Sequence, residues 1–302
     1  MKIIDSHSHL GDILYPCGGE LIGKKNIAMP SKFDIVAYNE SMLQRSFGLG
    51  EILYNLLVNF ATKSERARNA AATLENMGRS LDELDISYTV CLPIAPYLTY
   101  QDLAKARLVD DRIIPFTSID FSLGSGAVTQ VTCDVGEGAM GLKLHPIIQR
   151  KPLDDPLVLE VLQDFARHKK PVLTHAGVSH YYLGDEKGLN HPENGKIAKI
   201  EELVRTFPSI NFVVGHAGLF QVNEVCKRLK GLANVWVDTS FQAPEVITKL
   251  IDTFGAEKVM YASDWPYGYR KPAVKAVQVA CKGDAALEEL LFYKNAALLL
   301  GV

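Results

Sequence analysis

The chain has 302 residues, of which 47% are hydrophobic, and its formal charge is −3. This length allows one large globular domain or two ordinary ones. Lysine and arginine are dispersed without a basic run, so the charge pattern indicates neither nucleic acid nor an anionic membrane as a partner. No stretch approaches the ~20 apolar residues of a membrane span, and no leader pattern precedes the first strand-like segment. We therefore expect a cytoplasmic protein that acts on a small molecule, and a homodimer is compatible with these features.

The cysteines do not indicate a disulfide framework. There are five of them, widely spaced and without a Cys-x-x-Cys pair. An odd, scattered set of this kind argues against paired disulfides and against a thiolate zinc site. A reducing compartment fits this pattern.

Residues 2–10 form a short apolar strand that ends in two histidines, His7 and His9. Side chains at positions i and i+2 of a strand point to the same side, so both imidazoles can face one point. Neutral imidazole is a common ligand of zinc and similar metals, and a catalytic site needs about three or four protein ligands. The pair alone is also typical of an exposed turn, so a metal site requires further ligands.

Residues 11–81 are the least regular part and indicate a helical insertion beside the main fold. Apolar residues recur at helical spacing over 40–60 and over 64–84, and Ser64 precedes the second segment where an N-cap is expected. A structural cap and a lid that shapes a substrate pocket are both consistent with this insertion.

From residue 86 onward, apolar β-branched runs alternate with helical segments. Strands are expected at 88–92, 113–118, 139–144, 171–174, 211–215, 235–238 and 259–262. Helices are expected at 99–109, 127–137, 156–168, 196–207, 221–229, 244–254, 271–281 and 284–300. With the N-terminal strand this makes eight strands.

Alternating strands and helices indicate a parallel sheet, and near-continuous apolar strands indicate a sheet buried on both faces. We predict an α/β fold, a (β/α)8 TIM barrel spanning 1–302 as one domain with the insertion at 11–81. The alternative is a doubly wound open sheet, but no Gly-x-Gly-x-x-Gly follows the first strand.

Histidines and acids cluster where the predicted strands stop. Besides His7 and His9, these residues are Lys143, His145, His175, His216 and Asp264. In a barrel, all these strand ends lie on the C-terminal rim, where active sites of this fold are built. Singly, each could be a core histidine or a helix cap. Together, several buried imidazoles and a carboxylate are most economically explained by a shared cation.

The order of motifs resembles the amidohydrolase superfamily, and within it the branch typified by aminocarboxymuconate semialdehyde decarboxylase. The motifs are Asp-Ser-His-Ser-His at 5–9, Gly-Leu-Lys-Leu-His-Pro at 141–146, Thr-His-Ala-Gly at 174–177, Gly-His-Ala-Gly at 215–218 and Ser-Asp-Trp-Pro at 263–266. The resemblance implies that His7, His9, His175 and Asp264 bind one divalent metal. It also implies that His216 activates or orients the water bound to that metal.

The resemblance leaves the metal and the lysine open. Zinc is the expected ion, and manganese is the alternative because Asp264 adds an oxygen to a nitrogen-rich set. In binuclear members a carbamylated lysine at the position of Lys143 bridges two ions, but a mononuclear site is expected in this branch. We therefore expect Lys143, with His145 and Arg270, to contact the substrate or support the site.

The residues predict an enzyme, and two reactions fit them. A bound divalent ion can lower the pKa of water from ~15.7 to about 7, and His216 and Asp264 can handle its proton. We expect a metal-dependent hydrolase of a lactone or amide in a small carboxylate-bearing molecule. The alternative is a metal-dependent, non-oxidative decarboxylase of an aromatic or unsaturated acid. Hydrolysis is ranked first because no separate acid for protonating carbon is evident.

Overall fold

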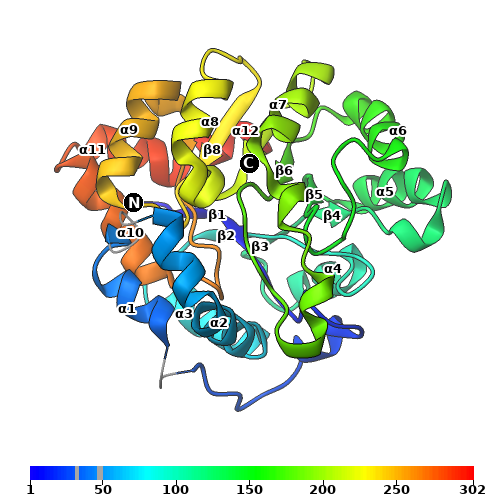
Figure 1. Ribbon diagram of the computed structural model, residues 1–302, viewed down its shortest axis with the longest axis horizontal. Coiled ribbons are helices and arrows are strands. Elements are labelled where there is room, and N and C mark those ends of the chain that lie inside the picture. The colour runs from blue at the N-terminus through cyan, green and yellow to red at the C-terminus, as the bar shows by residue number, and fades with distance from the viewer. Residues whose placement is uncertain (31–33, 46–49) are drawn as a thin grey trace.

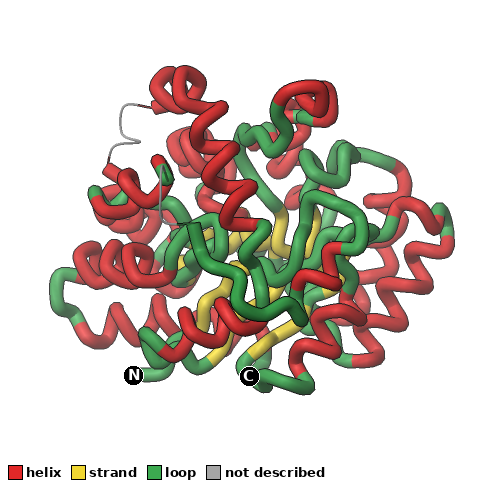
Figure 2. The backbone as a smooth tube through the Cα atoms, turned by 90° about the horizontal axis from the view of Figure 1, so that it is seen from below, coloured by secondary structure: helices red, strands yellow, loops and turns green. Residues whose placement is uncertain are grey.

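The computed structural model describes residues 1–30, 34–45 and 50–302. Short parallel strands form its centre and helices enclose them (Figure 2). The strands are β1 (Ile4–Ser8), β2 (Tyr88–Cys91), β3 (Ile113–Pro115), β4 (Thr117–Ser118), β5 (Leu142–Leu144), β6 (Val172–Thr174), β7 (Phe212–Val214), β8 (Val235–Asp238) and β9 (Val259–Met260). Each lies within or close to a predicted run, and β8 has the predicted bounds.

The strands form a closed parallel barrel. They pair in chain order in two ladders, β1 to β3 and β4 to β9. β3 and β4 are separated only by Phe116, whose N–H donates to Cys91 O at 3.0 Å, so they share one strand position. The ring closes where Ser8 forms a parallel bridge to Trp265. Nine strands with one shared position give eight positions, which confirms the predicted (β/α)8 barrel.

Two-residue periodicity fills both sides of the barrel wall. Along β6, Leu173 belongs to one buried cluster while Val172 belongs to another. The first cluster takes one residue from most strands and also residues of the last helix, so it is the barrel interior. Its strand members are Ile4, Val90, Ile114, Leu173, Val213, Trp236 and Met260. Alternate residues face the surrounding helices, which explains why these strands are apolar throughout.

Helices follow the strands around the barrel. They are α4 (Tyr100–Arg107), α5 (Gly126–Glu137), α6 (Pro156–Phe165), α7 (Ile197–Thr206), α8 (Val222–Leu229), α9 (Pro244–Phe254), α10 (Arg270–Cys281), α11 (Ala285–Glu289) and α12 (Asn295–Leu300). Local signals set their starts: Thr99 and Asp102 form a capping box on α4, and Asp155 caps α6 ahead of Pro156. The helix expected over 284–300 is instead α11, a π-helical turn (Leu290–Lys294) and α12.

Three helices of the insertion lie together at one side of the barrel (Figure 1). They are α1 (Ile35–Ser41), α2 (Gly50–Asn69) and α3 (Leu74–Asp82). The predicted boundary at Ser64 is wrong, because its hydroxyl donates to Phe60 O within α2, and Thr73 caps α3 instead. The expected helix over 40–60 lies partly outside the described residues. Within the described chain, no helix is long and apolar enough to cross a membrane.

Arg68 of α2 joins the insertion to the barrel. Its side chain is fully buried, and it donates to Asp34 at 2.8 Å, to both oxygens of Glu40 and to Tyr267 O at 2.6 Å. Its guanidinium also lies 3.9 Å from the ring centroid of Tyr269. Both tyrosines belong to the loop after β9, so one cation links α1, α2 and the barrel rim.

Replacing Arg68 with methionine should strongly destabilise the fold. The change leaves Asp34 and Glu40 buried without their cation, which costs about 3–5 kcal/mol of unfolding free energy. Urea unfolding followed by circular dichroism and by fluorescence measures this loss. The control is Arg79→Met in α3, whose ion pair with Glu75 is exposed and should matter little. Equal losses in both variants would show that Arg68 does not anchor the insertion.

Candidate metal centre

The predicted strand-end residues converge on one rim of the barrel. His7 is in β1 and His9 follows it, Lys143 is in β5, and His175, His216 and Asp264 follow β6, β7 and β9. All of these side chains are buried. Tertiary structure therefore brings together polar groups that are spread over more than 250 positions of the chain.

His7, His9 and Asp264 form one group of potential metal ligands. The Nε2 atoms of His7 and His9 lie 3.3 and 3.4 Å, respectively, from Asp264 Oδ1. The opposite nitrogens are occupied, because His7 Nδ1 donates to Asp238 Oδ2 and His9 Nδ1 donates to Leu92 O, both at 2.8 Å. With the proton on Nδ1, each neutral ring directs its Nε2 lone pair toward the carboxylate oxygen.

Two buried atoms at this centre have no hydrogen-bond partner among the described residues, Asp264 Oδ1 and His175 Nδ1. His175 uses its other nitrogen, Nε2, with Gly177 O at 3.2 Å and Ser179 Oγ at 3.1 Å. An unpaired buried acceptor is costly, and lone pairs facing a carboxylate repel it unless a cation lies between them. These donors fit a divalent metal ion, so the rim contains a buried His/Asp metal-binding site.

The pKa shifts of the buried residues at the rim also support a metal site. Burial lowers the pKa of His7, His9 and His216 well below its usual value, so these rings are neutral and able to act as ligands at pH 7. Burial also raises the pKa of Asp264 well above its usual value. A carboxylate in this position needs a positive charge nearby, and a bound cation supplies one.

His216 is held beside this group by a strained turn. Residues 216–219 all have positive φ, and His216 itself has φ 55°. Its ring stacks on His7 at a centroid distance of 4.6 Å. The Ser240 hydroxyl donates to Asp238, so it must accept the proton of His216 Nδ1, 2.7 Å away. This leaves His216 Nε2 unprotonated on a ring that lines the cavity described below.

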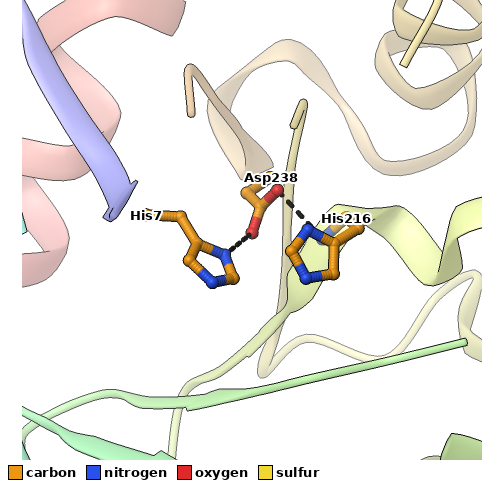
Figure 3. A group of neighbouring side chains, drawn as sticks. All are labelled: His7, His216 and Asp238. Atoms are coloured by element: carbon orange, nitrogen blue, oxygen red, sulfur yellow. Dashed lines mark hydrogen bonds and ion pairs between the residues drawn. The ribbon is translucent and has the colours of Figure 1, made fainter. Parts of the chain in front are cut away.

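Asp238, at the end of β8, organises the two histidines on either side of it (Figure 3). It accepts from His7 Nδ1 at 2.8 Å, from His216 N–H at 2.9 Å, and from the N–H and hydroxyl of Ser240. His7, His216 and Asp238 also have ligand atoms close enough to share a metal. However, four accepted hydrogen bonds occupy this carboxylate, so its role is to orient the imidazoles.

Our sequence reasoning missed Asp238. It carries the same signal as the residues that were found, a polar side chain where an apolar strand ends. Its partners are His7, 231 positions away, and His216, 22 positions away, and these separations have no pattern in the sequence.

Of the remaining predicted residues, Lys143 and His145 lie beside the metal-binding group, whereas Arg270 does not. Lys143 Nζ lies 3.2 Å from His7 Nε2, and burial lowers the pKa of this amine to about 8. His145 stacks on His175 at 4.2 Å, and its Nε2 lies 3.1 Å from the Tyr181 hydroxyl. Both therefore belong to the centre. Of the two, His145 lines the cavity.

Arg270 does not reach the centre. It is buried in an ion pair with Asp5 at 2.8 Å, and it also donates to Ser80 and Thr89. It is not among the cavity-lining residues. The tentative assignment of Arg270 to substrate binding is therefore replaced by a structural role, because its guanidinium is occupied between β1, β2 and α3.

A cavity of about 570 Å³ opens onto the metal-binding site. His9, His175, His216 and Asp264 form one part of its lining. Much of the remainder is apolar or aromatic and comes from the insertion helices and from the loops after β7 and β8. These residues include Val36, Tyr54, Ala61, Leu219, Phe220 and Phe241.

A closed barrel with a buried His/Asp metal site at its rim defines a metal-dependent TIM-barrel enzyme. The family model of the amidohydrolases (Amidohydro_2) matches residues 59–302, and the chain belongs to this family. This confirms the superfamily indicated by the strand-end motifs. No curated protein matches the chain.

Solved structures share the fold along the whole chain. One is a 5-carboxyvanillate decarboxylase from Novosphingobium aromaticivorans complexed with manganese and a nitrobenzoic acid (TM-score 0.65, 18% identity, 99% of this chain and 96% of that one). Another is a 2,6-dihydroxybenzoate decarboxylase from Rhizobium (0.65, 12%, 100% and 99%). A third is a probable 2-pyrone-4,6-dicarboxylic acid hydrolase from Acinetobacter baumannii with bound citric acid (0.61, 15%, 100% and 100%). At these identities the likeness shows the fold alone.

Asp238→Asn should weaken metal binding by about 10- to 100-fold. The asparagine amide cannot accept from His7 and Ser240 as the carboxylate does, so the imidazoles lose their fixed orientation. Competition with a chelating dye measures the affinity. Asp134→Asn is the matched control, because Asp134 is also buried and accepts from Thr117 but lies outside the centre. Unchanged affinity in Asp238→Asn would refute the orienting role.

Proposed function

We propose that the protein is a metal-dependent, non-oxidative decarboxylase of an aromatic or unsaturated carboxylic acid. This reverses the order of the two reactions expected from the sequence, where hydrolysis came first. The observation that carries the proposal is the distribution of positive charge around the cavity. Positive charge is available at the metal centre, while the described side chains of the remaining lining supply none that is free.

Two cationic side chains line the cavity, Arg45 and Lys249, among the described residues. Arg45 is exposed and forms an ion pair with Glu245 at 2.9 Å. Lys249 is also exposed and donates to Asn223 at 2.5 Å. Neither offers an unpaired buried cation for a substrate carboxylate.

This distribution favours decarboxylation over hydrolysis. A lactone or amide with a carboxylate needs two polar loci, one for the scissile carbonyl and one for the carboxylate. In a decarboxylation, the carboxylate that binds at the metal centre is the group that leaves, so one locus is enough. The aromatic part of the cavity lining suits the rest of such an acid. Two of the three similar structures named above are decarboxylases of aromatic acids, which supports the same choice.

We assign His7, His9, His175 and Asp264 as the metal ligands. A bound divalent ion would supply a Lewis acid that holds the substrate oxygens and stabilises negative charge. In the overall change, the bond between the carboxyl carbon and the adjacent carbon breaks, carbon dioxide leaves, and the remaining carbon takes a proton. We assign this transfer to His216 as a relay: its unprotonated Nε2, on a ring that lines the cavity, accepts a proton from water or from the acid group of the substrate and passes it to the carbon.

Protein purified without chelator should contain about one divalent ion per chain. Zinc is our first expectation from the nitrogen-rich ligands, and manganese is the alternative, which the similar Novosphingobium decarboxylase contains. Elemental analysis gives both the identity and the count. Two ions per chain, with a mass increase on Lys143 matching carbon dioxide, would replace the mononuclear site by a carbamate-bridged pair.

His216→Asn should retain the metal and lose turnover by about 100-fold or more, because it removes the imidazole that we assign to proton transfer. His9→Ala should lose the metal, because it removes a ligand. The assay is a panel of aromatic and unsaturated acids, lactones and amides, followed for both carbon dioxide and released acid with metal-loaded protein. Hydrolysis without carbon dioxide anywhere in the panel would return the hydrolase to first place. Equal metal loss in the two variants would make His216 a ligand.

A further inference from the structure

Glu65 is an acidic residue in the cavity lining to which neither the sequence nor the metal centre gives a role. It lies on the barrel-facing side of α2, one turn after Ala61 and one turn before Arg68. It lines the same cavity as Asp264, Tyr181 and Tyr267, and its negative charge raises the pKa of all three. The insertion therefore contributes a carboxyl group to the same space as the metal ligands.

The carboxyl group of Glu65 forms no hydrogen bond or ion pair with the residues that the structure describes. Arg68 is a cation on the same helix face, but its donors are occupied by Asp34, Glu40 and Tyr267 O. Glu65 is partly accessible because it faces the cavity. Its surroundings nevertheless desolvate it, which raises its pKa to about 7.

Apart from the metal ligand Asp264, other buried acids among the described residues have partners. Asp5 has Arg270, Glu40 has Arg68, and Asp238 accepts four hydrogen bonds. A carboxyl group without such partners costs free energy unless something else satisfies it. Because Glu65 faces a cavity beside a metal site, the partner that fits is a bound molecule.

We propose that Glu65 is a substrate-recognition residue that binds a ring hydroxyl of an aromatic acid whose carboxylate lies at the metal centre. This inference rests on the proposed function for the carboxylate end, and it adds a second, polar contact at the insertion. It also gives α2 a direct part in the site, so the insertion shapes the pocket as well as covering it.

A hydroxyl is the group that best suits this position. A hydroxyl can donate to the charged form of a carboxyl group and accept from its neutral form, so it suits Glu65 in either state. An ammonium group would need the charged form alone, and a second carboxylate would be repelled by it. The aromatic residues Tyr267, Phe220 and Phe241 line the same cavity and suit a ring.

The test is calorimetric binding of simple acids to the metal-loaded full chain, which needs no turnover. The probes are 3- and 4-hydroxybenzoate, with 3- and 4-methylbenzoate as matched acids of similar shape that lack the hydroxyl. We expect at least one hydroxybenzoate to bind about tenfold or more tightly than its methyl partner. In Glu65→Leu this preference should fall to about twofold or less, while the methylbenzoates keep their affinity.

Glu65→Gln is the conservative variant, and its amide should retain most of the preference because it can both donate and accept. Thermal unfolding checks that each variant folds, and Glu65→Ala replaces the leucine variant if that one does not. A hydroxyl preference that survives in Glu65→Leu and Glu65→Ala, or none in the natural protein, would overturn the inference.

Measuring carbon dioxide with the same acids separates this inference from the proposed function. Hydroxyl-dependent binding through Glu65 without carbon dioxide release would refute the decarboxylase and leave the recognition role. Carbon dioxide release with no effect of Glu65 on hydroxyl preference would do the reverse. If none of the four acids binds, the recognition role is refuted.

Discussion

Two imidazole nitrogens converge on one carboxylate oxygen in a buried rim, and much of the active site depends on keeping them there. His7 Nε2 and His9 Nε2 lie within 3.4 Å of Asp264 Oδ1, an arrangement that needs a shared cation. The barrel supplies the frame, because Asp264 N–H donates to His7 O where the first and last strands meet. Asp238 supplies the orientation, since it binds the far nitrogen of His7 and the backbone of His216.

The insertion completes the site through two residues of α2, one turn apart, that differ in whether protein groups occupy their side chains. Arg68 is saturated by protein groups and anchors the helix to the loop after β9. Glu65, one turn earlier, has no such partner among the described residues and faces the cavity. A rigid anchor beside an unsatisfied polar group is how a scaffold positions a contact for a ligand. The same helix therefore links the stability of the cap to the selectivity of the pocket.

Much of the architecture was readable from local patterns. The strand at 235–238 and the helix at 244–254 have the predicted bounds, because apolar periodicity is set by each segment's own buried face. The convergence of His7, His175 and Asp264 also followed, since all parallel strands of a barrel end at one rim. These inferences needed only the order of residues along the chain.

Local sequence patterns were enough to predict the barrel, its rim and the protein family. Which polar groups already have partners depends on the tertiary fold. Arg270 is neutralised by Asp5, 265 positions away, so it is unavailable to a substrate. Asp238 orients histidines on other strands, and Glu65 faces the cavity without a partner in the described part of the chain. Periodicity is a property of one segment, whereas hydrogen-bond partners depend on the packing of segments far apart in the chain.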